Sequence, residues 1–200
     1  MSGAIDFYFD FSSPYGFLAS QKIEALAQKY GRSVDWHPIL LGVIFKETAA
    51  APLTMIPLKG EYSKRDLARS ARFHGLEFRM PSKFPIATQA AARIVLWLEG
   101  RDSELAVRIA KALYGAYFLG DVDISDPEQA IAVAAGEGVD ANEARAAIGD
   151  PAVKQGLKRE VEQAIARGVF GSPYVIVDGE PFWGLDRFDQ VERWLATGGF

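Results

Sequence analysis

The chain has 200 residues, of which 49% are hydrophobic and 24% are charged, and its formal net charge at pH 7 is −4. This composition is typical of a globular protein with one sizeable core or two smaller lobes. The acidic balance and the lack of an uninterrupted basic patch argue against a nucleic-acid partner. The chain has no cysteine, which excludes disulfides, dithiol exchange, thiolate metal sites and a cysteine nucleophile.

The sequence predicts neither a signal peptide nor a membrane span. Asp6 and Asp10 interrupt the N-terminal apolar run that a signal peptide needs. The most apolar helical stretch, residues 87–98, contains Gln89 and Arg93 and is too short to cross a bilayer. We therefore expect a cytoplasmic protein with no membrane partner.

The first 41 residues indicate a strand, a helix and a second strand. Residues 7–11 are rich in aromatic side chains, which have high strand propensity. Ser13 is a preferred N-cap and Pro14 a preferred first helical residue, so we expect a helix from there to residue 30. Residues 33–41 have the β-branched and aromatic content of a strand, which Pro38 confines to an edge or a bulge. A β-α-β connection of this kind is normally parallel and right-handed.

The rest of the chain divides into a helical middle and a short strand-rich end. Residues 49–57 show no periodicity, and Asp178-Gly179 is a hairpin signal between two strands. Asp186 is expected to cap a final helix. The expected helices of the middle are residues 62–74, 86–99, 102–118, 126–137, 140–148 and 151–167, and the expected strands of the end are residues 174–177 and 180–183.

Several short motifs point to one family. They are DFYFDFSSPYGFLA at residues 6–19, Phe-Lys at 45–46, Lys-Gly at 59–60, Arg-Asp-Leu at 65–67, Ala-Tyr-Phe at 116–118 and GVFGSPYVIVDGEPFWGLDR at 168–187. Together they resemble the 2-hydroxychromene-2-carboxylate isomerases, which are relatives of the kappa-class glutathione transferases. The motifs occur in order over nearly the whole chain, and the two end motifs are the specific ones.

The resemblance implies an α/β, thioredoxin-like fold with an inserted all-helical domain. In this arrangement a Pro precedes the third strand, and the turn that carries Cys-x-x-Cys in thioredoxins is Ser13-Pro14-Tyr15-Gly16 here. We expect residues 1–45 and 168–200 to form a discontinuous thioredoxin-like domain, and residues 46–167 to form the helical insertion. Ser172-Pro173 is a candidate cis peptide on the same ground.

The family's site residues fall on named positions of this chain. The resemblance implies a homodimer with reduced glutathione as its cofactor, and it places Ser13 on the catalytic serine that holds the glutathione sulfur. Polar contacts of the family are lost at Ala50 and Leu185, where relatives carry Asn or Ser. The remaining glutathione positions are Ser172, whose backbone pairs with the tripeptide, Lys59, and the segment of Trp183, Gly184, Leu185 and Asp186, which receives the γ-glutamyl end.

Ser13 has two interpretations, a plain helix N-cap and a hydrogen-bond donor to a thiolate. A serine hydroxyl at a helix N-terminus is sufficient to stabilise a thiolate without any base. A Ser-His-Asp hydrolase is not expected, because such a triad needs a histidine base. His37 lies in the second predicted strand and His74 at the end of a charged helix, and neither forms a metal-ligand pair by spacing.

The sequence therefore predicts a glutathione-dependent isomerase of aromatic catabolism. It would interconvert a hydroxychromene carboxylate and a hydroxybenzylidenepyruvate through a transient glutathione adduct. Lys46 and Phe84 are expected to line the pocket for this small aromatic substrate, at the junction of the two lobes. Two alternatives stay open, a kappa-type transferase that conjugates electrophiles and a thioredoxin-like binding module without turnover.

Overall fold

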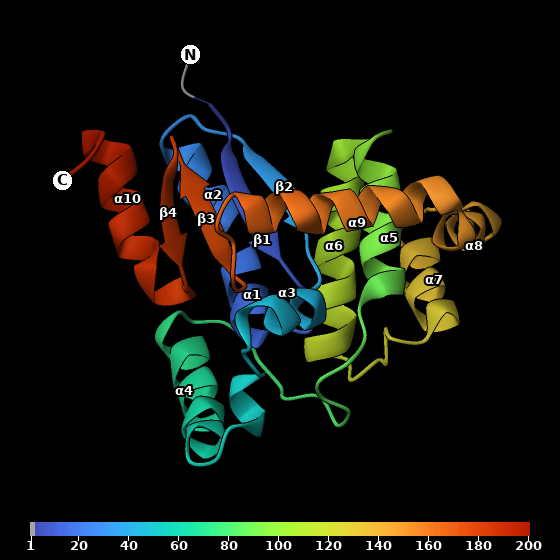
Figure 1. The fold of residues 1–200 in the computed structure, drawn as a ribbon, viewed down its shortest axis with the longest axis horizontal. Helices are drawn as coiled ribbons and strands as arrows, with labels where there is room; N and C mark the ends of the chain where they lie inside the picture. The colour runs from blue at the N-terminus through green and yellow to red at the C-terminus, as the bar shows by residue number, and fades with distance from the viewer. Residues whose placement is uncertain (1–2) are drawn as a thin grey trace.

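A four-stranded sheet forms the centre of the computed structural model, which describes residues 3–200 (Figure 1). The strand order is β2-β1-β3-β4. β1 (Ile5–Phe9) pairs in parallel with β2 (Val34–Pro38) and antiparallel with β3 (Tyr174–Val177), which pairs antiparallel with β4 (Glu180–Trp183). The predicted parallel β-α-β unit is confirmed, and β2 lies at the sheet edge as Pro38 predicted.

The other elements are helical and cover both faces of the sheet. The six helices predicted between residues 62 and 167 all form, each within three residues of the expected ends. The helices are α1 (Pro14–Ser20), α2 (Ile23–Lys29), α3 (Leu41–Thr48), α4 (Lys59–Phe73), α5 (Gln89–Glu99), α6 (Ser103–Phe118), α7 (Pro127–Gly136), α8 (Ala141–Gly149), α9 (Pro151–Ala166) and α10 (Phe188–Thr197), with short 3-10 helices η1 (Leu53–Met55) and η2 (Leu185–Arg187).

Two predictions for the N-terminal part are wrong in detail. The expected single helix to residue 30 is broken between α1 and α2, where the Ser20 hydroxyl donates to the Phe17 carbonyl at 2.7 Å and competes with the helical ladder. The second strand ends at Pro38, and α3 starts at Leu41, inside the predicted strand. The Leu41 amide donates to the carboxylate of Asp10. The acceptor at the start of α3 therefore comes from a distant residue, and no local capping residue marks this start in the sequence.

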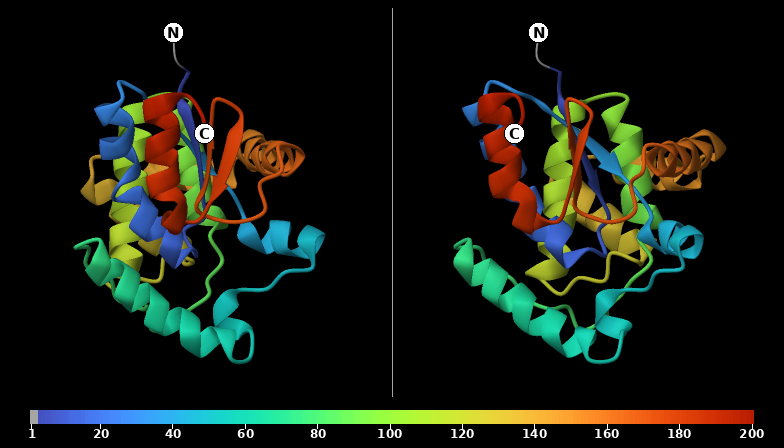
Figure 2. Two further views of the ribbon diagram at one scale, coloured as in Figure 1. Left: turned by 90° about the vertical axis from the view of Figure 1, so that its left-hand side faces the viewer. Right: turned by 60° about the vertical axis from the view of Figure 1, so that its left-hand side comes forward.

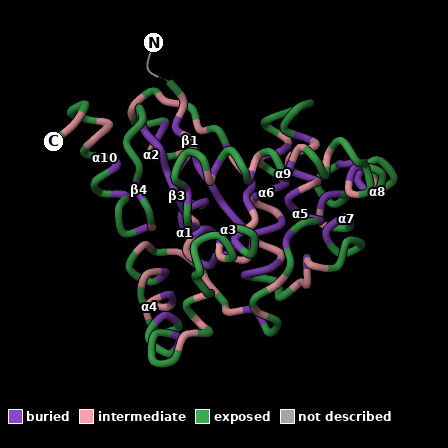
Figure 3. The backbone as a smooth tube through the Cα atoms, in the orientation of Figure 1, coloured by how far each residue is buried: buried purple, intermediate pink, exposed green. Residues whose placement is uncertain are grey.

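The two faces of the sheet bury different apolar clusters. On one face Phe7, Phe9 and Trp36 pack together and join the inner sides of α1, α2, α5, α6 and α10. The other face carries Tyr8, which packs against α3 and α9 in a smaller cluster. Burying each such large side chain stabilises the fold by about 1.5–3 kcal/mol. Figure 2 shows α9 and α10 on opposite sides of the sheet, and Figure 3 shows the buried residues along β1 and β3.

The larger cluster runs without interruption from β1 into α5, α6, α7 and α8. Residue 46, where the helical insertion was expected to begin, lies inside α3. The division into two domains therefore stays a prediction. No helix within residues 3–200 is long and apolar enough to cross a membrane.

Candidate functional site

Ser13 lies in the turn between β1 and α1, as the sequence predicted. It is the N-cap of α1, and its Oγ accepts a hydrogen bond from the backbone N–H of Gly16 at 3.0 Å. Its hydroxyl donates to the carbonyl oxygen of Ser172 at 2.7 Å. The residue is only 4% exposed. The N-cap interpretation is confirmed, and the same hydroxyl also touches the second loop of the expected site.

That second loop contains Ser172 and Pro173, which precede β3. The peptide bond between them is cis, as expected from the resemblance. The Ser172 Oγ accepts a hydrogen bond from the backbone N–H of Asp10 at 3.1 Å. Two segments from opposite ends of the chain therefore meet at Ser13, and two hydrogen bonds through Ser172 hold them together.

Buried polar residues beneath this turn were not predicted from the sequence. The Asp10 carboxylate is 2% exposed and accepts hydrogen bonds from the amides of Ser12 at 2.7 Å and Leu41 at 2.6 Å. Thr88 also hydrogen-bonds this carboxylate, and burial raises its pKa to about 6. The Tyr114 hydroxyl donates to the Asp10 backbone carbonyl at 2.8 Å. A charged residue inside the aromatic run of residues 7–11 was the signal that could have identified this group.

Gly16 allows the groups of the site to come so close together. A Cβ atom added there would lie 2.7 Å from Tyr114 Oη, 2.8 Å from Ser172 Oγ and 3.0 Å from the Ser13 Cβ. Non-bonded atoms do not approach so closely without a shift of one partner. The glycine of the Ser-Pro-Tyr-Gly turn therefore has a packing role that only glycine fills.

The expected γ-glutamyl segment starts beside the same loop. The Gly184 amide donates to the Pro173 carbonyl at 3.1 Å, and Trp183 packs its indole over Gly171. Leu185 is buried in the core, so its side chain offers no contact to a ligand. Trp183 and Gly184 thus contact the residues on either side of Ser172, whose carbonyl accepts from Ser13.

The predicted capping role of Asp186 is wrong. Asp186 lies within η2, and α10 begins at Phe188 after Arg187, with no side-chain cap. The Asp186 carboxylate instead folds back over Gly184, where a Cβ atom would lie 2.4 Å from its Oδ1, and 74% of this side chain is exposed. The Arg187 guanidinium lies 3.4 Å from this carboxylate, which caps no helix and stays accessible to a ligand.

The structure does not place the other expected residues against Ser13. Lys59, the first residue of α4, and Lys46 on α3 are exposed, and Phe84 is half-buried against the main core. α4 is nevertheless tied to the site, because the hydroxyl of Tyr15 in α1 donates to Asp66 at 2.6 Å. The ligand roles of both lysines and of Phe84 stay predictions.

Neither histidine reaches the site. His37 lies between the carboxylates of Asp6 and Glu160, and His74 contacts the ammonium group of Lys22. Burial and the Lys22 charge lower the pKa of His74. No cluster of three metal-ligating side chains occurs within the described residues. The geometry therefore offers no histidine base to Ser13.

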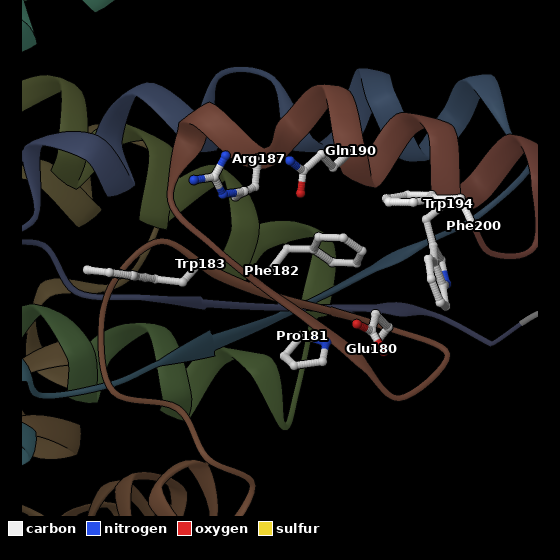
Figure 4. Close-up of a pocket in the computed structure, with 8 residues that line it drawn as sticks. All are labelled: Glu180, Pro181, Phe182, Trp183, Arg187, Gln190, Trp194 and Phe200. Carbon is white, nitrogen blue, oxygen red and sulfur yellow. The ribbon is translucent and has the colours of Figure 1, made fainter.

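A separate surface groove lies between β4 and α10, with a volume of about 340 Å³ (Figure 4). Of the residues expected to bind glutathione, Trp183 lines it, whereas Ser13 and Ser172 do not. Figure 4 shows the Trp183 side chain at one end of the groove and Trp194 and Phe200 at the other. The groove therefore adjoins the candidate site at Trp183 without containing its central serine.

Comparisons with known proteins identify the fold family. The DsbA-like thioredoxin domain family matches residues 4–196. A solved structure of a 2-hydroxychromene-2-carboxylate isomerase has a TM-score of 0.86 to this chain at 25% identity, and the match covers 96% of this chain and 94% of that one. A probable DsbA oxidoreductase from Streptomyces coelicolor, with a TM-score of 0.77 at 21% identity over 96% of this chain and 89% of that one, shares the fold.

Relatives in sequence identify the group within this family. The chain is 30% identical over 198 residues to the 2-hydroxychromene-2-carboxylate isomerase of Sphingobium xenophagum, which covers 98% of this chain and 99% of that protein. It is 26% identical to glutathione S-transferase kappa 1 of Caenorhabditis elegans, over 94% of this chain and 88% of that protein. The chain therefore belongs to the DsbA-like thioredoxin family, in the group of 2-hydroxychromene-2-carboxylate isomerases and kappa-class glutathione transferases. The resemblance and the thioredoxin-like fold expected from the sequence are confirmed.

Proposed function

We propose that this protein is a glutathione-dependent isomerase that interconverts 2-hydroxychromene-2-carboxylate and a hydroxybenzylidenepyruvate in aromatic catabolism. One observation carries the proposal. A buried serine hydroxyl occupies the turn where thioredoxins carry their cysteines, and it points at the loop before β3. The names of the relatives that match over the whole chain support the same activity.

The residues present fit the chemistry of glutathione. Its thiol would meet the Ser13 hydroxyl, and its peptide backbone would pair with the main chain of Ser172. Its α-amino group carries a positive charge, and the exposed carboxylate of Asp186 is a suitable partner for it. Lys59 offers a cation for a carboxylate of the tripeptide. When bound, glutathione supplies a sulfur nucleophile that the cysteine-free chain does not have.

Ser13 would stabilise the ionised sulfur without losing its own proton. A free thiol has a pKa near ~8.5, and lowering this pKa by ~2 units requires ~2.7 kcal/mol of preference for the thiolate. A hydroxyl bond to a charged acceptor contributes about 1.5–3 kcal/mol. The Ser13 hydroxyl would exchange its neutral acceptor, the Ser172 carbonyl, for the anion. The dipole of α1 adds little, because this helix has only 7 residues.

The direct test follows the ultraviolet spectrum of 2-hydroxychromene-2-carboxylate with and without reduced glutathione. We expect a spectral change that needs both enzyme and glutathione, with no net loss of glutathione. Ser13→Ala should lower kcat/KM by about 10- to 150-fold, because it removes one hydrogen bond to an anion. The matched control is Ser33→Ala, since Ser33 is exposed and should tolerate the change. Full activity in Ser13→Ala would reject the serine's role.

The alternative activity is a kappa-type glutathione transferase, favoured by the relatives of that name. It differs in the fate of glutathione, which a transferase consumes in proportion to the electrophile added. Thiol titration during turnover separates the two activities. A binding module without turnover would show neither change, and calorimetry with glutathione would then show whether it binds the tripeptide.

We further propose that the chain works as a homodimer. Large apolar side chains are exposed on η1 and around the start of α4, among them Met55, Leu58 and Tyr62. Covering such side chains in an interface is favourable. Light scattering across a range of concentrations measures the mass directly, and a monomer at every concentration would reject the proposal. The cytoplasmic location stays a prediction from the sequence.

A further inference from the structure

Asp10 makes more contacts with the site than its position in the sequence suggests. Its backbone N–H donates to Ser172 Oγ at 3.1 Å, and its backbone carbonyl accepts from the amide of Ser13 and the hydroxyl of Tyr114, both at 2.8 Å. The main chain of this one residue therefore touches both loops of the site and α6.

The Asp10 carboxylate reaches two further elements. One oxygen accepts from the amide of Ser12 and the other from the amide of Leu41, the first residue of α3. The N-cap of α3, Leu40, has no side-chain cap of its own, and the first turn of α3 has no acidic residue. Asp10, directly after β1, thus supplies the negative charge and the acceptor that this helix start lacks. Thr88, directly before α5, completes the set.

We propose that Asp10 is a positioning residue whose buried carboxylate fixes the Ser13 turn to the starts of α3 and α5, and so holds the Ser13 hydroxyl in place for the sulfur of glutathione. The inference rests on the proposed function for the identity of the ligand. Asp10 touches no reacting atom in this scheme. Its carboxylate acts through Ser12, the neighbour of Ser13, while its main-chain N–H bonds the Ser172 loop.

The charge of Asp10 is not neutralised by a partner. Within residues 3–200 no cationic side chain hydrogen-bonds this carboxylate; its acceptor oxygens face the two amides and Thr88. The titratable groups that feel its charge are the phenols of Tyr114 and Tyr117 on α6, both with raised pKa values, mainly through burial. Because burial also raises the pKa of Asp10, to about 6, the carboxylate is ionised at neutral pH and protonated in mild acid.

The first experiment compares Asp10→Asn with Asp35→Asn. The amide of Asn places a donor opposite either the Ser12 or the Leu41 amide, so one of the two bonds is lost. We expect kcat to fall by about 10- to 100-fold, with glutathione affinity by calorimetry changed less than about threefold. Asp35 is exposed on β2, so the same change there should leave both unchanged. Wild-type kcat in Asp10→Asn overturns the proposal.

A second experiment needs neither turnover nor glutathione. In the ligand-free wild type, amide NMR shifts of Ser12 and Leu41 should titrate together near pH 6. The amide of Gly16, which bonds Ser13 Oγ, should follow with the same midpoint. A Gly16 amide that ignores this titration overturns the proposal, even if Asp10→Asn does not fold.

Thr88→Val should change the pKa of Asp10 without removing its carboxylate. It deletes a hydrogen bond to the ionised form of Asp10, so the shared midpoint should move to higher pH. The control is Thr197→Val on α10, whose hydroxyl donates to the Arg193 carbonyl and which should leave the midpoint unchanged. An unchanged midpoint in Thr88→Val counts against the proposal. If wild type binds no glutathione, the proposed function fails, while the coupling of Asp10 to the Ser13 turn is still decided by these shifts.

Discussion

Two polar clusters lie on β1, and they are built in opposite ways. The cluster at its end joins Ser13, Ser172 and Asp10 through hydroxyls and backbone groups, and its one carboxylate has no cationic partner within residues 3–200. The cluster on the face covered by α9 consists of opposite charges already in contact. There His37 lies 2.7 Å from Glu160 and 3.0 Å from Asp6, and Arg167 holds both oxygens of Asp6 at 3.1 and 2.7 Å.

The Ser13 cluster can accept a ligand, whereas the α9 cluster is a structural clamp of opposite charges. In the α9 cluster the donors and acceptors satisfy one another, which fastens α9 to β1 and β2 and leaves little for a ligand. Although burial acts to raise the pKa of Asp6, Arg167 and His37 lower it overall. The Ser13 cluster instead holds a hydroxyl proton on a neutral carbonyl, a bond that an anion can replace with a stronger one.

The largest expected effect comes from disturbing the Ser13 cluster through its packing. Gly16→Ala would push a Cβ against Tyr114 Oη and Ser172 Oγ. We expect a stability loss of about 1–3 kcal/mol and a fall in kcat of roughly 100-fold. Urea unfolding and turnover assays measure the two effects.

Gly115→Ala is the matched control for this change. It lies within α6, where a new Cβ meets no atom within 4 Å. Alanine there should leave stability equal or slightly higher, because it restricts the unfolded chain. Normal activity in Gly16→Ala would contradict the close packing described for the site.

The α9 cluster should respond to pH instead. Although burial acts to lower the pKa of His37, Glu160 and Asp6 raise it overall. Protonated His37 therefore stabilises the fold; this stabilisation is complete below the unfolded value of 6.5 and is lost as pH rises through the folded pKa. His37→Gln should be less stable than wild type by about 1 kcal/mol in mild acid, with the gap closing at alkaline pH. Activity at neutral pH should change little.

His74 should make stability depend on pH in the opposite direction. Burial and Lys22 lower its pKa, so wild type should lose stability relative to His74→Gln as pH falls through 6.5. Urea unfolding of both variants on either side of pH 6.5 checks the pair. If His37→Gln and His74→Gln gave the same pH dependence, the assignment of His37 to a clamp of opposite charges would be wrong.

The parts of this structure that local sequence determines were predictable. Ser13 followed by Pro14 marks the start of α1, and Asp178-Gly179 marks the hairpin between β3 and β4. The periodic helices of the middle formed close to their expected ends. In each case the residues that decide the conformation are neighbours in the chain.

The parts that distant contacts determine were not predictable. The start of α3 depends on Asp10, which lies 31 residues earlier, and the same carboxylate was not predicted to belong to the site. Asp186 has the chemistry of a cap, but its carboxylate folds back over Gly184, two residues earlier, where there is no Cβ atom. Thus the N-cap position of Ser13 was predicted from the sequence, whereas the buried Asp10 and Tyr114 beneath it were not.

The smallest expected effect concerns the link between the Ser13 cluster and α4. Figure 2 shows α4 standing apart from the sheet, and the Tyr15 hydroxyl bonds its Asp66 at 2.6 Å. Tyr15→Phe removes this bond while Asp66 keeps Arg69 as a partner, so we expect a loss of about 0.5–1.5 kcal/mol. If α4 carries Lys59 to glutathione, KM for glutathione should rise while kcat stays nearly constant, because Ser13 is untouched. Tyr62→Phe, which alters only an exposed contact with Arg69, should change neither constant; a fall in kcat without a change in KM would instead show that Tyr15 acts on the Ser13 turn itself.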